Sequence, residues 1–222
     1  TIADIIASSD TTITVRSNAA DAFAGGLKIE SDTGAVVETN TGWTYGEQSI
    51  ITDVTPAVGQ LNTEVTITGE RLRAHGASVD TVTLAGIEAS IQSEDDTSVV
   101  VIAAASGAAA GSTHLVSDTG ATTTLDNSFT YIAAAEIVSV NPSRGQVGTL
   151  VTIAGSRLRA GADEVTEVSL AGHAVIQIVR ESDDEVVVEA ALGEARQTEG
   201  AITMVTSSGA TVTSESVKWT YI

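Results

Sequence analysis

The sequence contains segments that repeat at a fixed distance along the chain. Residues 56–60 (PAVGQ) return 86 positions later as residues 142–146 (PSRGQ), and residues 69–74 (GERLRA) return at the same offset as residues 155–160 (GSRLRA). A fixed period of this length indicates an array of similar modules, each large enough to hold its own core. Such an array favours spacing, adhesion or scaffolding over catalysis, because an enzyme needs one specialised site.

We expect two complete repeats, over residues 50–132 and 136–222, and one partial repeat over residues 1–45. The partial repeat matches only the second half of a complete one, from just after the turn at Gly86 onward. Half a sandwich would have open strand edges and a bare core face. The explanation that we favour is a window from a longer array, and the alternative is that another chain supplies the missing strands.

The apolar residues follow the pattern of β-strands. They alternate with polar residues in segments such as 65–67 and 82–84, and most are β-branched. Short continuous apolar runs at 99–102 and 186–188 are typical of central strands. The alanine-rich segment 103–110 is interpreted as a loop, since glycine and serine interrupt it. Short strands separated by glycine-rich turns predict an all-β fold of sandwiches.

The segments between the repeats are very short. Residues 46–49 join the partial repeat to the first complete repeat, and residues 133–135 join the two complete repeats. Because three or four residues allow little freedom, successive modules are expected to touch end to end and to form a semi-rigid rod.

The composition excludes several classes of function. The net charge of −19, from 29 acidic and 10 basic residues, repels phosphate backbones, so nucleic acid is not an expected partner. The absence of cysteine excludes disulfides, thiolate metal sites and thiol nucleophiles. No apolar run approaches the ~18 residues that a membrane helix needs, so no membrane insertion is expected in this segment. An acidic surface with few lysines suits an extracellular or cell-surface setting.

Each complete repeat carries four motifs in a fixed order. They are an Ile-x-x-Val-x-Pro-x-x-Gly opening, a Thr-x-Val-Thr-Ile-x-Gly segment, a Val-x-Leu-Ala-Gly segment and a closing aromatic-Thr-Tyr triplet. They occupy residues 51–59, 63–69, 82–86 and 129–131, and again residues 137–145, 149–155, 168–172 and 219–221. This set resembles the IPT/TIG domain family. The resemblance implies tandem immunoglobulin-like (E-set, IPT/TIG) β-sandwiches arranged end to end, in one partial and two complete copies.

The motif residues suggest local roles. Pro56 and Pro142 are expected at the start of the first strand, where no ladder hydrogen bond is lost. Gly69 and Gly155 are expected to supply a turn conformation that other residues avoid. The aromatic residues of the closing triplets recur at one place in each repeat, which favours packing in a core or at a junction over a sugar-stacking platform; they are Trp43, Phe129 and Trp219.

Two pairs of arginines are the most regular polar feature. Arg71 and Arg73 recur as Arg157 and Arg159, where the family often has an Asn-Phe pair in place of Arg-Leu. Residues two apart on a strand share a face, so each pair could hold an acid or a sugar. We favour salt bridges to nearby acids, and treat the four arginines as candidate contacts with a module junction or a partner.

Acidic residues cluster twice before a Val-rich strand, and four of them, Asp95, Asp96, Asp183 and Asp184, are candidate calcium ligands. Their spacing lacks the alternation of a calcium loop and favours a solvated turn. The three histidines are not equivalent between repeats and lack the spacing of metal ligands; they are His75, His114 and His173.

The leading hypothesis is a non-enzymatic extracellular or cell-surface structural repeat protein that forms a stalk, rod or filament. Its partners would be other copies of itself or adjoining repeats of a longer chain. One alternative is an adhesin-type module that binds glycans or surface proteins through loops or a sheet edge. Another is an accessory segment of a larger carbohydrate-active enzyme. No catalytic residue and no cofactor other than calcium is expected.

Overall fold

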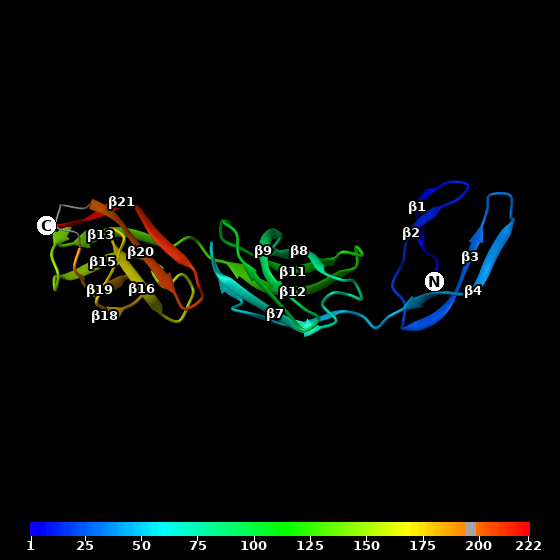
Figure 1. The fold of residues 1–222 in the computed structure, drawn as a ribbon, viewed down its shortest axis with the longest axis horizontal. Helices are drawn as coiled ribbons and strands as arrows, with labels where there is room; N and C mark the ends of the chain where they lie inside the picture. The colour runs from blue at the N-terminus through cyan, green and yellow to red at the C-terminus, as the bar shows by residue number, and fades with distance from the viewer. Residues whose placement is uncertain (194–198) are drawn as a thin grey trace. The chain divides into compact units, whose positions relative to one another are not determined.

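The computed structural model of the protein describes residues 1–193 and 199–222. It divides into two compact units, Thr1–Gln48 and Ser49–Ile222. Every regular secondary-structure element in the described residues is a β-strand, and Figure 1 labels most of these strands. The all-β prediction is therefore confirmed. No helix in this part of the chain is long and apolar enough to cross a membrane.

The second unit begins with a domain of eight strands, which we call the middle domain. In sheet order the strands run β5-β7-β10-β9-β8-β11-β12-β6, with β9 hydrogen-bonded to both β10 and β8. Buried side chains from both ends of this order belong to one core, so the sheet folds around that core as a sandwich. The strands are β5 (Ile50–Thr55), β6 (Val58–Gly59), β7 (Glu64–Glu70), β8 (Val79–Leu84), β9 (Ile87–Glu94), β10 (Ser98–Ile102), β11 (Ala109–Ser117) and β12 (Thr122–Tyr131).

The remaining strands form the C-terminal domain, a sandwich of two sheets. One sheet has the order β13-β15-β19-β18, and the other has the order β14-β21-β20-β16-β17. The part that corresponds to the single strand β9 is split here into β17 and β18. The strands are β13 (Glu136–Asn141), β14 (Arg144–Gly145), β15 (Leu150–Ser156), β16 (Val165–Leu170), β17 (His173–Ala174), β18 (Gln177–Glu181), β19 (Glu185–Glu189), β20 (Glu199–Thr206) and β21 (Thr211–Tyr221).

The alternating pattern of the sequence places the core. In β7, Val65 and Ile67 are fully buried, whereas Thr66 and Thr68 on the opposite face are half-buried. The continuous apolar run of β10 is hydrogen-bonded on both sides, to β7 and to β9, as expected for a central strand. The segment 103–108 has no regular structure, and β11 begins at Ala109.

The prolines do not start the first strand, and that prediction is wrong. Pro56 and Pro142 follow β5 and β13, each after a cis peptide bond, and precede the two-residue strands β6 and β14. Since β5 pairs with β7 and β6 pairs with β12, each proline lies where the chain passes from one face of the sandwich to the other. The missing N–H still costs no ladder bond, because the residue lies between strands.

The expected turn role of Gly69 and Gly155 is also wrong. Gly69 lies inside β7, where an added Cβ would stand 2.1 Å from the carbonyl oxygen of Ile50. Gly155 meets the carbonyl oxygen of Glu136 at the same distance. These glycines are needed for close approach of two strands. The left-handed conformation belongs to the second residue after Gly69, Arg71, at φ 54°.

The first unit contains two separate hairpins. One is formed by β1 (Asp4–Ser8) and β2 (Ile13–Arg16), and the other by β3 (Phe23–Glu30) and β4 (Val36–Tyr45), shown in blue in Figure 1. The structure describes every residue of this unit, and none of them is buried.

Candidate functional site

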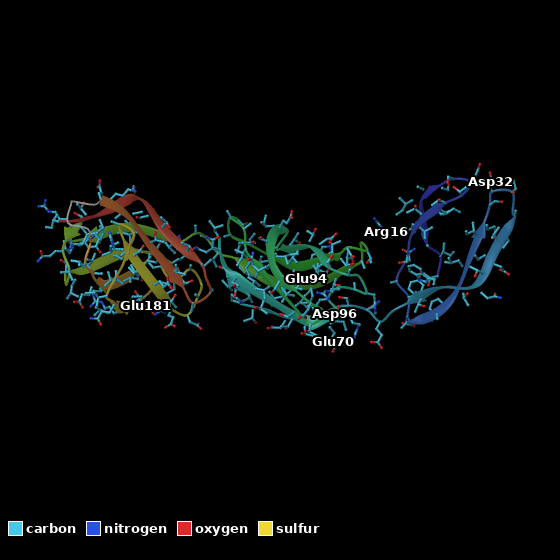
Figure 2. The ribbon with its side chains drawn as sticks, in the orientation of Figure 1. Arg16, Asp32, Glu70, Glu94, Asp96 and Glu181 are labelled. Carbon is cyan, nitrogen blue, oxygen red and sulfur yellow. The ribbon has the colours of Figure 1, made fainter. Side chains whose placement is uncertain are left out.

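Arg73 forms a multivalent contact inside the middle domain. Its Nε donates to Oε2 of Glu94 at 2.7 Å, and its Nη2 donates to the backbone carbonyl of Glu94 at 2.8 Å and to Oε1 at 3.2 Å. The backbone N–H of Arg73 donates to Oδ1 of Asp96 at 3.2 Å. Glu94 and Asp96 lie on the same domain in Figure 2. The contact ties the turn after β7 to the end of β9.

The same arrangement recurs in the C-terminal domain. Arg159 donates through Nε to Oε2 of Glu181 at 2.7 Å, and through Nη2 to Oε1 at 2.8 Å and to the backbone carbonyl at 3.2 Å. Its backbone N–H donates to Oδ1 of Asp183 at 3.1 Å. The hydrogen bond from Arg159 lowers the pKa of the Glu181 carboxyl below its ordinary value. We call these two arginine–glutamate pairs the arginine clamps.

The geometry of the arginines differs from the expectation that each pair shares a strand face. Arg71 and Arg73 lie in the turn that follows β7, and Arg157 and Arg159 lie in the turn that follows β15. The leucine between each pair is buried in the core, which fixes the turn against the sandwich. The sequence did not identify Glu94 and Glu181 as the partners of Arg73 and Arg159. The available signal was that both glutamates recur at the same position relative to the Val-rich strands.

Arg157 contacts the linker between the two domains. Its Nε donates to the carbonyl oxygens of Ala133 and Ala134 at 3.1 and 3.2 Å, and its Nη2 donates to the Ala134 carbonyl at 2.9 Å. Arg71 makes a different contact, an ion pair with Glu70 at 3.0 Å. The structure therefore places one of the four arginines at the junction of the two domains and two in clamps within domains.

Further contacts join the middle and C-terminal domains. The buried side chain of Gln60 accepts a hydrogen bond from the backbone N–H of Ala135 at 2.8 Å. The backbone N–H of Glu64 donates to the carbonyl of Ser208 at 2.8 Å, which links β7 to a turn of the next domain. We call these bonds, together with those of Arg157, the domain junction.

Close packing accompanies these bonds. Gly161 has φ +82°, and a Cβ added there would stand 3.1 Å from Cδ1 of Ile132 and 3.3 Å from Cγ1 of Val58. Both apolar side chains belong to the middle domain. The junction therefore combines backbone hydrogen bonds with apolar contact.

The candidate calcium ligands hold local backbone groups. Oδ1 of Asp95 accepts from the backbone N–H groups of Thr97 and Ser98 at 2.6 and 2.8 Å. These bonds, led by that of Thr97, lower the pKa of the Asp95 carboxyl. The backbone N–H of Asp184 donates to the Ser182 hydroxyl at 3.3 Å, and in the described part of the chain no three acidic or histidine side chains gather as a metal site. A calcium site therefore stays a prediction, without support from geometry.

The closing aromatics differ between units. Phe129 and Trp219 are buried in the cores of their domains, and Trp43 is 44% exposed. Trp43 packs edge-on against Tyr45 with ring centroids 5.7 Å apart, and Phe23 stacks on Tyr45 at 5.2 Å. The core position is thus observed in the two complete domains, while the first unit displays an exposed aromatic cluster.

The histidines occupy three unrelated settings. His114 Nδ1 hydrogen-bonds the Thr124 hydroxyl at 2.7 Å, and His173 packs edge-on against Tyr221 at 5.2 Å. His75 lies in the turn after β7 with φ 63°. A hollow in the middle domain is lined by residues that include Leu61, Ala89, Ile102 and Ala104. These features bring no set of reactive side chains together.

Two tandem sandwiches with the same strand plan and the same clamp define an immunoglobulin-like repeat protein. The sequence model of the IPT/TIG domain matches residues 49–131 and 135–221. The chain belongs to the IPT/TIG domain family, as its motifs predicted. A search of curated proteins found no match to the chain.

Solved structures resemble the chain to different degrees, and the plexin A4 structure given first shares its fold. A structure of the plexin A4 full extracellular region has a TM-score of 0.52 at 20% identity, covering 79% of this chain and 16% of the plexin chain. A second plexin A4 structure has a TM-score of 0.47 at 20% identity, covering 79% and 18%. A surface glycan-binding protein, SGBP-B of the Bacteroides ovatus mixed-linkage glucan utilization locus, has a TM-score of 0.32 at 16% identity, covering 96% and 56%. The chain thus spans about a sixth of the first plexin chain, and the likeness is one of fold.

Proposed function

We propose that the chain is a non-enzymatic structural segment of an extracellular or cell-surface protein, in which tandem IPT/TIG domains act as a spacer. The observation that carries the proposal is the domain junction. Gln60, Glu64 and Arg157 all bond backbone groups across it or in its linker. A junction held by several bonds and by apolar packing resists bending, which a spacer requires and a flexible linker lacks.

The polar groups of the domains support the non-enzymatic part of the proposal. Three of the four recurring arginines are engaged in clamps or at the linker, Arg71 pairs with Glu70, and the recurring acids hold backbone N–H groups. Each of these contacts stabilises a turn, and fold alone assigns no chemistry. Placement outside the cell rests on the acidic, cysteine-free composition and on a fold shared with an extracellular region of plexin A4. Assembly into a stalk or filament would follow from adding such junctions in series.

Glycan or protein binding is the weaker alternative for the complete domains. The aromatic residues that would form a sugar-stacking platform, Phe129 and Trp219, are buried in their cores. Only Trp43 among the three positions is exposed, so a platform would rest on the first unit alone. A glycan array tests this alternative, and we expect no binding that depends on the two complete domains.

A distance measurement across the junction tests the spacer. The chain has no cysteine, so Asp80→Cys and Glu167→Cys place two spin labels on exposed positions, one in each domain, without background. We expect a single narrow distance distribution by pulsed electron resonance. The double variant Gln60→Ala, Arg157→Ala removes junction bonds and should broaden it.

The control variant is Gln146→Ala. Gln146 is the counterpart of Gln60 in the C-terminal domain and is exposed in the structure. It should leave the distribution unchanged. A broad distribution in the otherwise unaltered chain would contradict the proposed spacer.

A further inference from the structure

The strand pairing of the first unit copies that of the middle domain residue by residue. In the first hairpin Ile5 lies opposite Val15, and 86 positions later Ile91 lies opposite Val101. A bulge interrupts both pairings at the corresponding place, between Ile5 and Ala7 in the first hairpin and between Ile91 and Ser93 in the middle domain. Strands β1 and β2 therefore have the register of β9 and β10.

The second hairpin follows the same rule. Gly25 lies opposite Trp43, as Gly111 lies opposite Phe129 in β11 and β12. Both ladders are interrupted directly after that pair. Since register decides which face each side chain occupies, the inward face of the first unit can be read from the middle domain.

The edges that this unit leaves open are the edges that receive further strands in a complete domain. In the middle domain β10 pairs with β7, and β11 pairs with β8. The counterparts of β10 and β11 are β2 and β3. In the first unit each of them pairs with a single strand of its own hairpin. Two sheet edges are therefore available for strand addition.

The inward face is apolar and exposed. Leu27, Ile29 and Val37 are 45%, 43% and 69% exposed. The strand pairing identifies the equivalent residues of the C-terminal domain. Met204 lies opposite Val212 there, as Ile29 lies opposite Val37 in the first unit. The C-terminal counterparts of Leu27, Ile29, Val37 and Trp43 are buried in its core; they are Ile202, Met204, Val212 and Trp219. The residues of the first unit are thus apolar like their counterparts, and they are exposed because no half-domain covers them.

We infer that the inward face of β1–β4 is a docking site for the first half of an IPT/TIG domain, a polypeptide segment that supplies strands equivalent to β5–β8. This inference goes beyond the spacer function, because it concerns the first unit and names what the unit binds. The C-terminal domain contains the best-matched segment in this chain, residues 135–172. That segment covers a core whose closing aromatic is also tryptophan.

The expected pairing follows from the C-terminal ladders. Leu170 lies opposite Ile202, and Val168 lies opposite Met204, so in the docked segment these two residues would face Leu27 and Ile29. Ile153 lies opposite Val186, the counterpart of Ile13, so the strand equivalent to β15 would add to β2. Docking thus buries the apolar face and pairs both open edges in one step.

A graft tests the inference in the full chain. A duplicate of residues 135–172 is placed directly before Thr1, so that the Ala-Gly turn at its end precedes the first unit as Ala85-Gly86 precedes β9. Trp219→Phe leaves Trp43 as the sole tryptophan, and phenylalanine already fills this position in the middle domain as Phe129. We expect a blue shift of Trp43 emission and at least a threefold fall in its quenching by acrylamide.

Two further samples complete the experiment. The ungrafted Trp219→Phe chain, mixed with a synthetic polypeptide of residues 135–172, should show the same change in proportion to the added polypeptide. A graft with aspartate in place of the duplicated Ile153 and Leu170 should leave Trp43 accessible, because charged residues would face the apolar positions.

The inference is overturned if Trp43 stays as accessible in the graft and in the mixture as in the ungrafted chain alone. It is also overturned if Trp43 becomes buried in the ungrafted chain as its concentration rises, because the face would then be an interface between copies. Neither result bears on the spacer, whose distance measurement lies wholly within residues 49–222.

Discussion

At the scale of single residues, Arg73 and Arg159 show how one side chain fixes a turn. Each guanidinium binds both the carboxylate and the backbone carbonyl of the same glutamate. The compact charge of a lysine would not reproduce this contact, because it lacks the planar set of donors. The adjacent leucine is buried, and the backbone N–H of each arginine donates to an aspartate carboxylate of the acidic cluster. The acidic cluster and the arginine pair, which look separate in the sequence, are thus parts of one arrangement.

The clamp should contribute more to stability than an exposed ion pair does. Arg159→Ala removes three hydrogen bonds to Glu181, which is largely buried. Arg180, on the same domain, pairs with Glu185 at the exposed surface, where such pairs contribute about 0–1 kcal/mol. Urea unfolding followed by Trp219 emission should show a clearly larger loss for Arg159→Ala than for Arg180→Ala. Equal losses would count against the clamp.

The clamp also predicts a dependence on pH. The pKa of Glu181 is lower in the folded chain than in the unfolded chain, so its ionised form stabilises the fold above the unfolded pKa. That contribution is lost as the pH falls through the folded pKa. Glu181→Gln should therefore destabilise the C-terminal domain at neutral pH, and its deficit against the unaltered chain should shrink as the pH falls below about 4. A deficit that is constant from pH 7 to 3 would contradict this account.

At the scale of elements, the first strand of each domain lies unusually close to the strand beside it. Gly69 allows the carbonyl of Ile50 to approach β7, and Gly155 does the same for Glu136 and β15. This approach brings the first strand onto the sheet directly before the clamp turn. The glycine recurs in both domains because the neighbouring strand leaves no room for a Cβ at this position.

Gly69→Ala should therefore destabilise the middle domain by about 1–3 kcal/mol, the usual cost of overpacking. Its added methyl group would collide with backbone at 2.1 Å, which cannot move aside as a side chain can. Gly107→Ala is the matched control in the same domain, because no atom lies within 4 Å of its added Cβ. Scanning calorimetry should show a fall in Tm for the first variant alone.

The elements that sequence predicted well are those with a local signal. Alternation predicted strand β7 and a continuous Val run predicted the central strand β10. Roles that depend on a partner from elsewhere in the fold were missed or misplaced. Gly69 was expected in a turn because its neighbour Ile50 is remote in sequence, and Glu94 was not matched with Arg73 for the same reason.

At the scale of the whole molecule, one strand plan occurs in three copies, two of them complete. The middle and C-terminal domains each surround a core, whereas the first unit carries the second half of the plan without a buried residue. The sequence likewise predicts a partial first repeat, because the motifs of the first half are missing from residues 1–45. The domain junction lay beyond sequence reasoning, which indicated contact from linker length but not the bonds of Gln60 and Arg157.

The central claim is that two complete IPT/TIG domains follow a unit whose apolar face and strand edges are open. Amide hydrogen exchange of the full chain, read strand by strand, tests this claim most directly. Bonds inside a closed sandwich exchange only through substantial unfolding, whereas bonds at open hairpins exchange readily. We predict strong protection in β7, β10, β15 and β19, and little protection in β2 and β3. Protection of β2 and β3 equal to that of β10 and β11 in the isolated, monomeric chain would contradict the account.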